Sequence, residues 1–189
     1  MPITTLDAKS ALVVIDLQKG LLGIPALHPL AGIIANASAL ATGFREHGLP
    51  VVLVNAAGRP PGRTDQQRPP LAFPPGWTDI VPELGQRDDD LAITKHASGA
   101  FGESALAPQL RARGVTQVVV VGVSSSNGVE STARQAYDLG FNVTVAVDAI
   151  TDVDAAAHEN SLVRVFPRLA ETGTTADVLA LLAARGAQG

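Results

Sequence analysis

The chain has 189 residues, enough for one domain with a substantial core, and its 46% hydrophobic and 17% charged composition excludes a disordered chain. Its net charge of -4 gives no electrostatic reason to expect nucleic acid as a partner, and the absence of Cys excludes disulfides, thiolate metal ligands and a thiol nucleophile. No apolar run approaches the roughly 18 residues of a membrane span, and MPITTLDAKS lacks the pattern of a secretory signal, so we expect a cytoplasmic protein with no membrane partner.

Short β-branched runs alternate with helical patterns along the chain. We expect strands at 11–15, 51–55, 91–94, 117–122 and 142–147, and helices near 30–47, 104–113, 129–139, 155–165 and 176–184. The strand runs are almost continuously apolar, which is typical of parallel strands covered on both faces. The alternation predicts one α/β domain over 1–189, a three-layer αβα Rossmann-like sandwich with a mostly parallel sheet of about six strands.

Polar groups follow three of these strands, at the sheet edge where such folds bind ligands. Asp16 follows ALVVI, Lys95 follows LAIT, and the turn SSSNG follows QVVVVGV. If the strands before Asp16 and Lys95 are neighbours, the ammonium can contact the carboxylate. Two interpretations stay open. The first is that Asp16 and Lys95 are functional; the second is that they are structural, either as an ion pair or with the Asp as a cap of the next segment.

A long Pro-rich loop, AAGRPPGRTDQQRPPLAFPPGW at 56–77, leaves the second strand on the same side. A loop of this length in a compact domain is typical of a functional lid. Arg59, Arg63 and Arg68 concentrate positive charge in it and suit a carboxylate ligand, unless they are simply solvated. We expect Trp77 or Phe101 to form a wall of the pocket, the alternative being ordinary packing.

The turn before the third helix pattern, at 129–139, carries the spacing of a capping box. Asn127 and Glu130 predict a helix with Asn127 as its cap and Gly128 as its first residue, and such a helix start also offers N–H groups to an anion. A serine nucleophile would need a base within reach and the G-x-S-x-G pattern is not met, so hydroxyls that line the turn are the simpler interpretation. The four His residues are scattered and predict no metal site.

Four segments in order, ALVVIDLQKG, LAITKHASGAFGES, VVVVGVSSSNGVESTARQAYDLGFNVTVAVDAITD and AHENSLVRVFPRLAETGTTADVL, resemble the isochorismatase-like hydrolases. Most members of that superfamily use an Asp–Lys–Cys triad, which the resemblance places at Asp16, Lys95 and Gly128, with Gly in place of Cys. The resemblance also implies a non-proline cis peptide around 123–124. The zinc-binding nicotinamidase branch carries His in the loop after the second strand, and this loop has none, so we expect neither a metal nor another cofactor.

True isochorismatases also lack the Cys, and the resemblance implies that Asp16 acts here as an acid toward a small carboxylated or cyclic vinyl ether such as isochorismate. The aromatic–Ala–His segment of those enzymes is replaced by three serines. We expect the substrate to be bound by residues of the loops and the turn: Gln18, Arg63, Trp77, Phe101, Ser124, Ser125, Ser126 and Asn127. The alternatives are a non-catalytic or regulatory binding protein, or an amide hydrolase using Ser126 or an activated water. Relatives commonly form dimers or tetramers, which implies a homo-oligomer.

Overall fold

The computed structural model describes residues 3–65, 72–102 and 104–186. Its strands are β1 (Ser10–Ile15), β2 (Val51–Ala56), β3 (Leu91–Lys95), β4 (Gln117–Val123), β5 (Asn142–Thr151) and β6 (Glu171–Gly173). Its α-helices are α1 (Leu30–Glu46), α2 (Leu106–Ala112), α3 (Glu130–Asp138), α4 (Ala155–Asn160) and α5 (Thr175–Gly186). None of these helices is long and apolar enough to cross a membrane.

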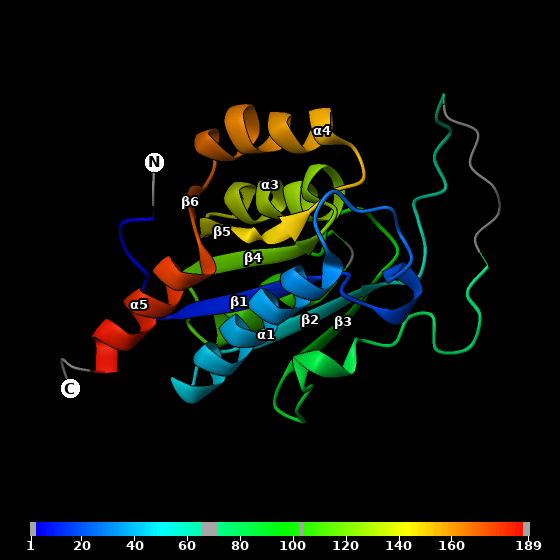
Figure 1. Ribbon diagram of the computed structural model, residues 1–189. Helices are drawn as coiled ribbons and strands as arrows, with labels where there is room; N and C mark the ends of the chain where they lie inside the picture. Colours follow the sequence, from blue (N-terminus) through cyan, green and yellow to red (C-terminus); the bar gives the residue numbers. More distant parts are fainter. Residues whose placement is uncertain (1–2, 66–71, 103, 187–189) are drawn as a thin grey trace.

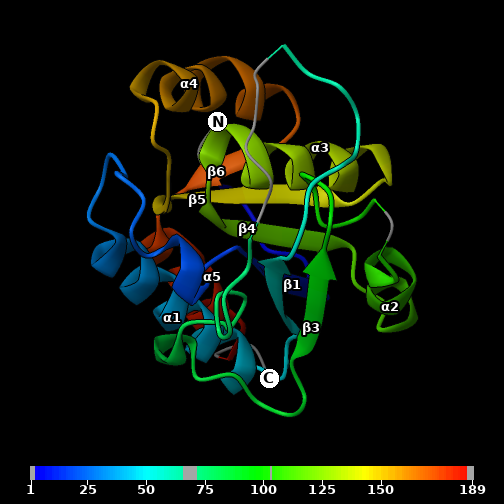
Figure 2. The same ribbon diagram turned by 90° about the vertical axis from the view of Figure 1, so that its right-hand side faces the viewer.

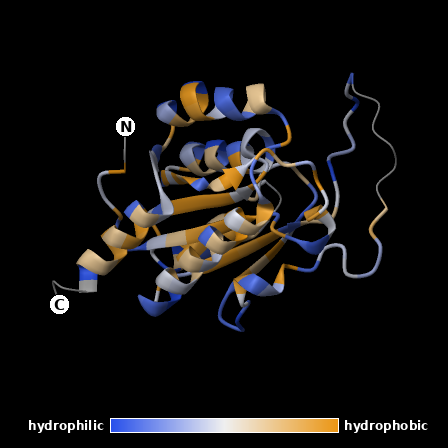
Figure 3. Cartoon of the chain, viewed as in Figure 1, coloured by the Kyte–Doolittle hydropathy of each residue, from blue (hydrophilic) through white to orange (hydrophobic). Residues whose placement is uncertain are grey.

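The strands form a parallel sheet with the order β3-β2-β1-β4-β5-β6, six strands within the described residues. Helices α1 and α5 cover one face of the sheet (Figure 1), and helices α2 and α3 cover the other. Figure 3 shows hydrophobic strands between helices of mixed hydropathy. The predicted three-layer α/β fold is confirmed.

The central strand β1 shows why apolar runs form this sheet. All of its residues are buried; Leu12 and Val14 contribute to the core beneath α1, while Val13 and Ile15 contribute to the core beneath α3. Because successive side chains of a strand point to opposite faces, a strand covered on both sides needs apolar residues at every position. The predicted strand positions follow from this pattern, with ends that differ by a few residues.

Two elements depart from the predicted pattern. The short strand β6 pairs with β5 through residues Glu171–Gly173, and no apolar run marks it in the sequence. Strand β5 continues past the predicted end to Thr151, because a register shift opposite β4, between Val120 and Gly122, lets pairing resume farther along. Both departures depend on neighbouring strands and not on local composition.

Gly122 lets β1 and β4 approach each other beside their carboxyl ends. It pairs with Ile15 across the sheet and has a φ of 114°, a backbone conformation that side chains disfavour. A Cβ atom at this position would lie 2.0 Å from the Ile15 carbonyl oxygen, which is backbone and has no room to move. The position therefore requires glycine.

We expect Gly122→Ala to lower the free energy of unfolding by at least about 3 kcal/mol, because it adds a steric overlap to an unfavourable φ. Gly140→Ala is the matched control: Gly140 has a φ of 83° but no atom within 4 Å of its ideal Cβ, so we expect a loss of about 1 kcal/mol. Urea unfolding measures both. Equal losses of unfolding free energy in the two variants would show that the contact with the Ile15 carbonyl adds no cost beyond the unfavourable φ.

Candidate active site

The candidate site lies where the strand order of the sheet reverses. Strands β1 and β4 are neighbours in space, and their connections leave toward opposite faces, so a crevice opens beyond their carboxyl ends. Asp16 directly follows β1, and Ser124 directly follows β4. The sequence predicted its candidate residues at this edge of the sheet. Figure 2 shows the molecule from the side on which the loop after β2 lies.

Asp16 and Lys95 form a buried ion pair, with 2.8 Å between Lys95 Nζ and Asp16 Oδ2. The strands that carry them are not neighbours, because β2 lies between β1 and β3. The Lys side chain is long enough to cross the end of β2, a span of roughly two strand spacings of 4.8 Å. Its ammonium also donates to the carbonyl oxygen of Ala97 at 3.3 Å. The predicted contact between Asp16 and Lys95 is present, although the two strands that carry these residues are not adjacent.

The second oxygen of Asp16 is left without a partner. Asp16 is 6% exposed and adopts a φ of 54°, and its Oδ1 accepts no hydrogen bond from any described residue. Burial raises the pKa of Asp16 from 3.8 to about 6, and the charge and hydrogen bond of Lys95 offset part of that rise. Close to neutral pH the carboxyl can therefore hold a proton on the oxygen that does not face Lys95.

Gly128 packs against this carboxyl. An ideal Cβ at Gly128 would lie 3.2 Å from Asp16 Oδ2, 2.9 Å from Ile15 Cγ2 and 3.0 Å from the carbonyl oxygen of Val123. These contacts are tighter than ordinary van der Waals packing, so the turn has no room for a side chain unless its neighbours shift. Glycine fits this close packing, whereas a larger residue would require Ile15 or the backbone at Val123 to shift.

A pocket of about 390 Å³ opens from Asp16, Lys95 and Gly128. Of the predicted substrate-binding residues, Trp77, Ser124 and Asn127 border it. The other residues around it, most of them apolar or small, are Leu21, Ile24, Ala56, Gly58, Arg59, Pro60, Ala97, Ser98, Val123 and Val153. The sequence analysis missed Leu21, Ile24 and Val153, because an apolar residue in a loop gives no sign of which way it faces.

Gln18 and Phe101 lie outside this pocket lining. The Gln18 side chain is fully buried, accepts from the backbone N–H of Ala56 at 2.7 Å and donates to the carbonyl oxygens of Ala56 and Trp77. It therefore joins β2 to the segment that carries Trp77. Phe101 belongs to the core and its ring lies 5.7 Å from that of Phe141.

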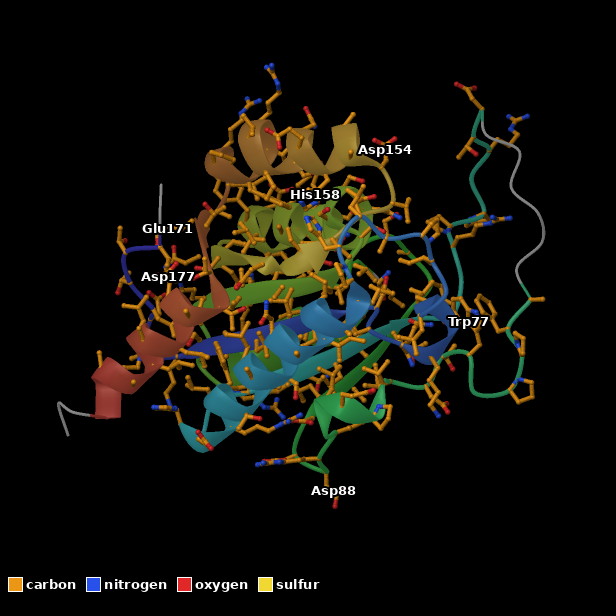
Figure 4. All side chains as sticks on the ribbon, viewed as in Figure 1. Trp77, Asp88, Asp154, His158, Glu171 and Asp177 are labelled. Atoms are coloured by element: carbon orange, nitrogen blue, oxygen red, sulfur yellow. The ribbon has the colours of Figure 1, made fainter. Side chains whose placement is uncertain are left out.

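The arginines of the loop after β2 differ in their positions. Arg59 borders the pocket, whereas Arg63 is exposed and lies outside the pocket lining. Arg68 falls outside the described residues. Trp77 is anchored where the loop returns to the domain, with its ring 4.7 Å from that of Phe73 (Figure 4).

Ser125 and Ser126 turn away from the pocket. Their hydroxyls donate to Asp152 Oδ2 at 3.1 and 2.8 Å, and Ser125 Oγ also lies 2.6 Å from His158 Nδ1. Neither serine borders the pocket. The arrangement holds the turn in place and does not present either hydroxyl beside Asp16.

The predicted capping box is wrong. Residues Ser125–Val129 form a π-helical turn that precedes α3, and Val129, not Asn127, occupies the cap position without a side-chain hydrogen bond. Glu130 instead contacts Arg134 at 3.0 Å and accepts from Ser161 Oγ at 2.7 Å. The extra residue in this turn rotates Asn127 to the pocket rim. The peptide bond Val123–Ser124 just before it is cis, as the resemblance implied.

Among the described residues, no group of three or more His, Asp or Glu side chains is arranged to hold a metal ion. The polar groups that border the pocket are instead one carboxyl, two cationic side chains, two hydroxyls and one amide, from Asp16, Lys95, Arg59, Ser98, Ser124 and Asn127. This set can donate a proton from Asp16 and can orient an anionic or polar small molecule.

Comparison with known proteins gives the same fold over almost the whole chain. The isochorismatase domain model matches residues 10–177. The chain is 39% identical to the uncharacterized isochorismatase family protein YecD of Escherichia coli O157:H7, over 92% of this chain and 97% of YecD. It is 30% identical to an isochorismatase of Bacillus subtilis, over 80% of this chain and 50% of that protein. An isochorismatase family protein from Burkholderia thailandensis has a solved structure with a TM-score of 0.91 and 38% identity, covering 95% of this chain and 98% of its own.

We expect Gly128→Ala to lower the free energy of unfolding by about 2 kcal/mol, because the added methyl group must displace Ile15 or the backbone at Val123. Gly32→Ala is the control, since Gly32 is also helical but has no atom within 4 Å of its ideal Cβ; we expect it to be neutral or stabilising by up to about 1 kcal/mol. Thermal and urea unfolding compare the two. A Gly128→Ala protein as stable as the parent would contradict the close packing.

Proposed function

This chain belongs to the isochorismatase family, and from that premise we propose that it is a hydrolase that cleaves a small carboxylated vinyl ether such as isochorismate. The observation that carries the proposal is Asp16, a buried carboxyl that borders the pocket beside Gly128 and whose Oδ1 has no partner among the described residues. Amide hydrolysis through a covalent intermediate needs a nucleophile at this place, and Gly128 offers none. Cleavage of a vinyl ether needs a proton donor and water.

In the proposed reaction, Asp16 gives its proton to the terminal carbon of the vinyl ether. The carbon–carbon double bond supplies the electron pair for the new C–H bond, and an oxocarbenium ion forms at the ether carbon. Water adds to that carbon and loses a proton to the Asp16 carboxylate. The hemiketal then breaks the bond between the ether carbon and the ring oxygen, and its hydroxyl proton passes to the ring oxygen, so that a ketone and a ring alcohol are released. Asp16 thus acts as general acid and then as base.

Lys95 has a different part in this scheme. Its ammonium lies 2.8 Å from Asp16 Oδ2, so it stabilises the carboxylate that remains after the proton has left. The cost is a lower proton affinity before the step, which burial must outweigh for Asp16 to be an acid near neutral pH. Arg59 and Asn127 border the same pocket and supply donors suited to a substrate carboxylate.

The name of the Bacillus subtilis relative, isochorismatase, supports isochorismate as the first substrate to test. We expect the purified protein to release pyruvate from isochorismate, and Asp16→Asn to reduce the rate by at least about 100-fold, because an amide can still accept from Lys95 but has no acidic proton. Asp177→Asn is the control, as Asp177 is an exposed residue of α5. No pyruvate from a folded parent protein would exclude isochorismate as the substrate.

The pH dependence separates an acid from a base at Asp16. Because the protonated carboxyl is the reactive form, we expect kcat/KM to be level below pH 6 or so and to fall about tenfold per pH unit above the pKa of about 6. Pyruvate release measured between about pH 5 and pH 8 gives this profile. A kcat/KM that rises through the same range would mean that the ionised Asp16 is the active form.

A further inference from the structure

Both oxygens of the Asp152 carboxylate accept several hydrogen bonds. It follows β5, is 2% exposed, and its Oδ2 accepts from the Ser125 hydroxyl and from both the N–H and the hydroxyl of Ser126 at 2.7 to 3.1 Å. Its Oδ1 accepts from the N–H groups of Val153 and Asp154 at 2.8 and 3.3 Å. Burial opposes ionisation of this carboxyl, but these donors outweigh burial and lower its pKa, so it is charged at neutral pH.

These contacts join three segments that border the pocket. The Ser126 contacts hold the turn that contributes Asn127 and Gly128, and the backbone contacts hold the connection that contributes Val153. The carbonyl oxygen of Asp152 accepts from the N–H of Leu27 at 2.8 Å, at the end of the loop that contributes Ile24. Asp152 therefore connects the three segments that contribute Ile24, Asn127, Gly128 and Val153 to the pocket lining.

His158 extends this network behind the turn. Because the single Ser125 hydroxyl proton is directed to Asp152, His158 Nδ1 must donate to Ser125 Oγ, which fixes the tautomer of the ring. Burial lowers the pKa of His158, and the nearby His28, with a ring distance of 5.2 Å, lowers it further. Figure 4 shows His158 on α4, facing the sheet. The hydrogen bonds run in one direction, from His158 through Ser125 to Asp152.

The opposite side of the same turn faces Asp16. Gly128 stands so close to Asp16 Oδ2 and Ile15 that an added Cβ would lie within 3.2 Å of both. The turn backbone therefore covers the Oδ2 side of the buried carboxyl. A small outward movement of the turn would expose that side to water, because glycine at 128 has no side chain to cover it.

We propose that Asp152 is a positioning residue that holds the turn of residues 124–128 against Asp16 and so keeps water away from the side of this carboxyl that faces the turn. This rests on the proposed function for its catalytic meaning, but the physical claim concerns the folded protein alone. A carboxylate is needed because both of its oxygens accept from N–H groups. An amide of the same size would turn an NH2 group toward one set of those donors.

The test is a carbon-13 NMR titration of the Asp16 carboxyl, identified by the signal that Asp16→Asn removes. In the parent protein we expect a midpoint near the pKa of about 6. In Asp152→Asn the loosened turn admits water to Asp16, so the midpoint should fall by about one unit toward the ordinary value. Ser126→Ala keeps the charge of Asp152 and removes one hydroxyl donor, and it should lower the midpoint by roughly half a unit.

Asp148→Asn is the matched control. Asp148 lies on β5 and also accepts an N–H and a hydroxyl, both from Thr175 at 2.7 and 2.9 Å, but it does not border the pocket. In the Asp148→Asn protein, we expect the Asp16 carboxyl to titrate with the same midpoint as in the parent protein. A shift in Asp152→Asn without one in Ser126→Ala would reflect only the lost charge and would overturn the proposal, as would equal shifts in Asp152→Asn and Asp148→Asn.

An unchanged Asp16 midpoint in a folded Asp152→Asn protein would also overturn the proposal. If that variant fails to fold, Ser126→Ala decides: a lowered midpoint supports the positioning role, and an unchanged one excludes it. Pyruvate release from isochorismate is followed in parallel. If the parent releases none, the proposed function fails for that substrate while the titration still gives its own answer, so the two failures are distinguishable.

Discussion

The buried Asp16 carboxyl is the feature on which the rest of the site depends. A carboxylate at the end of a central apolar strand is costly unless it is paired, and Lys95 pairs with only one of its oxygens. The other oxygen accepts no hydrogen bond from any residue that the structure describes, and the burial of the carboxyl raises its pKa. The sheet imposes this burial, because β1 lies between β2 and β4 and is covered on both faces. The raised pKa of Asp16 is therefore a consequence of where the fold puts this residue.

Two glycines make the close approach around that carboxyl possible. Gly122 lets β4 run against the Ile15 carbonyl, and Gly128 lets the following turn pack on Asp16. At Gly128, a side chain would require Ile15 or the backbone at Val123 to shift. Glycine at this position thus belongs to a close packing arrangement of the turn on Asp16. Asp152 supports it from behind, through hydrogen bonds to the turn.

Individual residues show how far local sequence can predict a site. Asp16 and Lys95 were predictable because each ends an apolar strand run, and parallel strands bring such ends to one edge. Asn127 was assigned a cap from its spacing to Glu130, but the π-helical turn adds a residue and places it at the pocket rim. Gln18 and Phe101 were expected to contact substrate, and the structure places both outside the pocket lining, in backbone bridging and core packing.

The sequence by itself determined the α/β class, the order of the main elements and the pair of Asp16 and Lys95, because apolar periodicity and strand ends are local properties. Only the tertiary structure decided that Lys95 reaches across β2, that Ser125 and Ser126 face Asp152, and that Leu21, Ile24 and Val153 border the pocket. These depend on strand order, on the conformation of turns and on contacts between segments more than 100 residues apart, such as Leu21 and Val153 around one pocket. Contacts of this kind determine which way a side chain points, and no local sequence pattern encodes that direction.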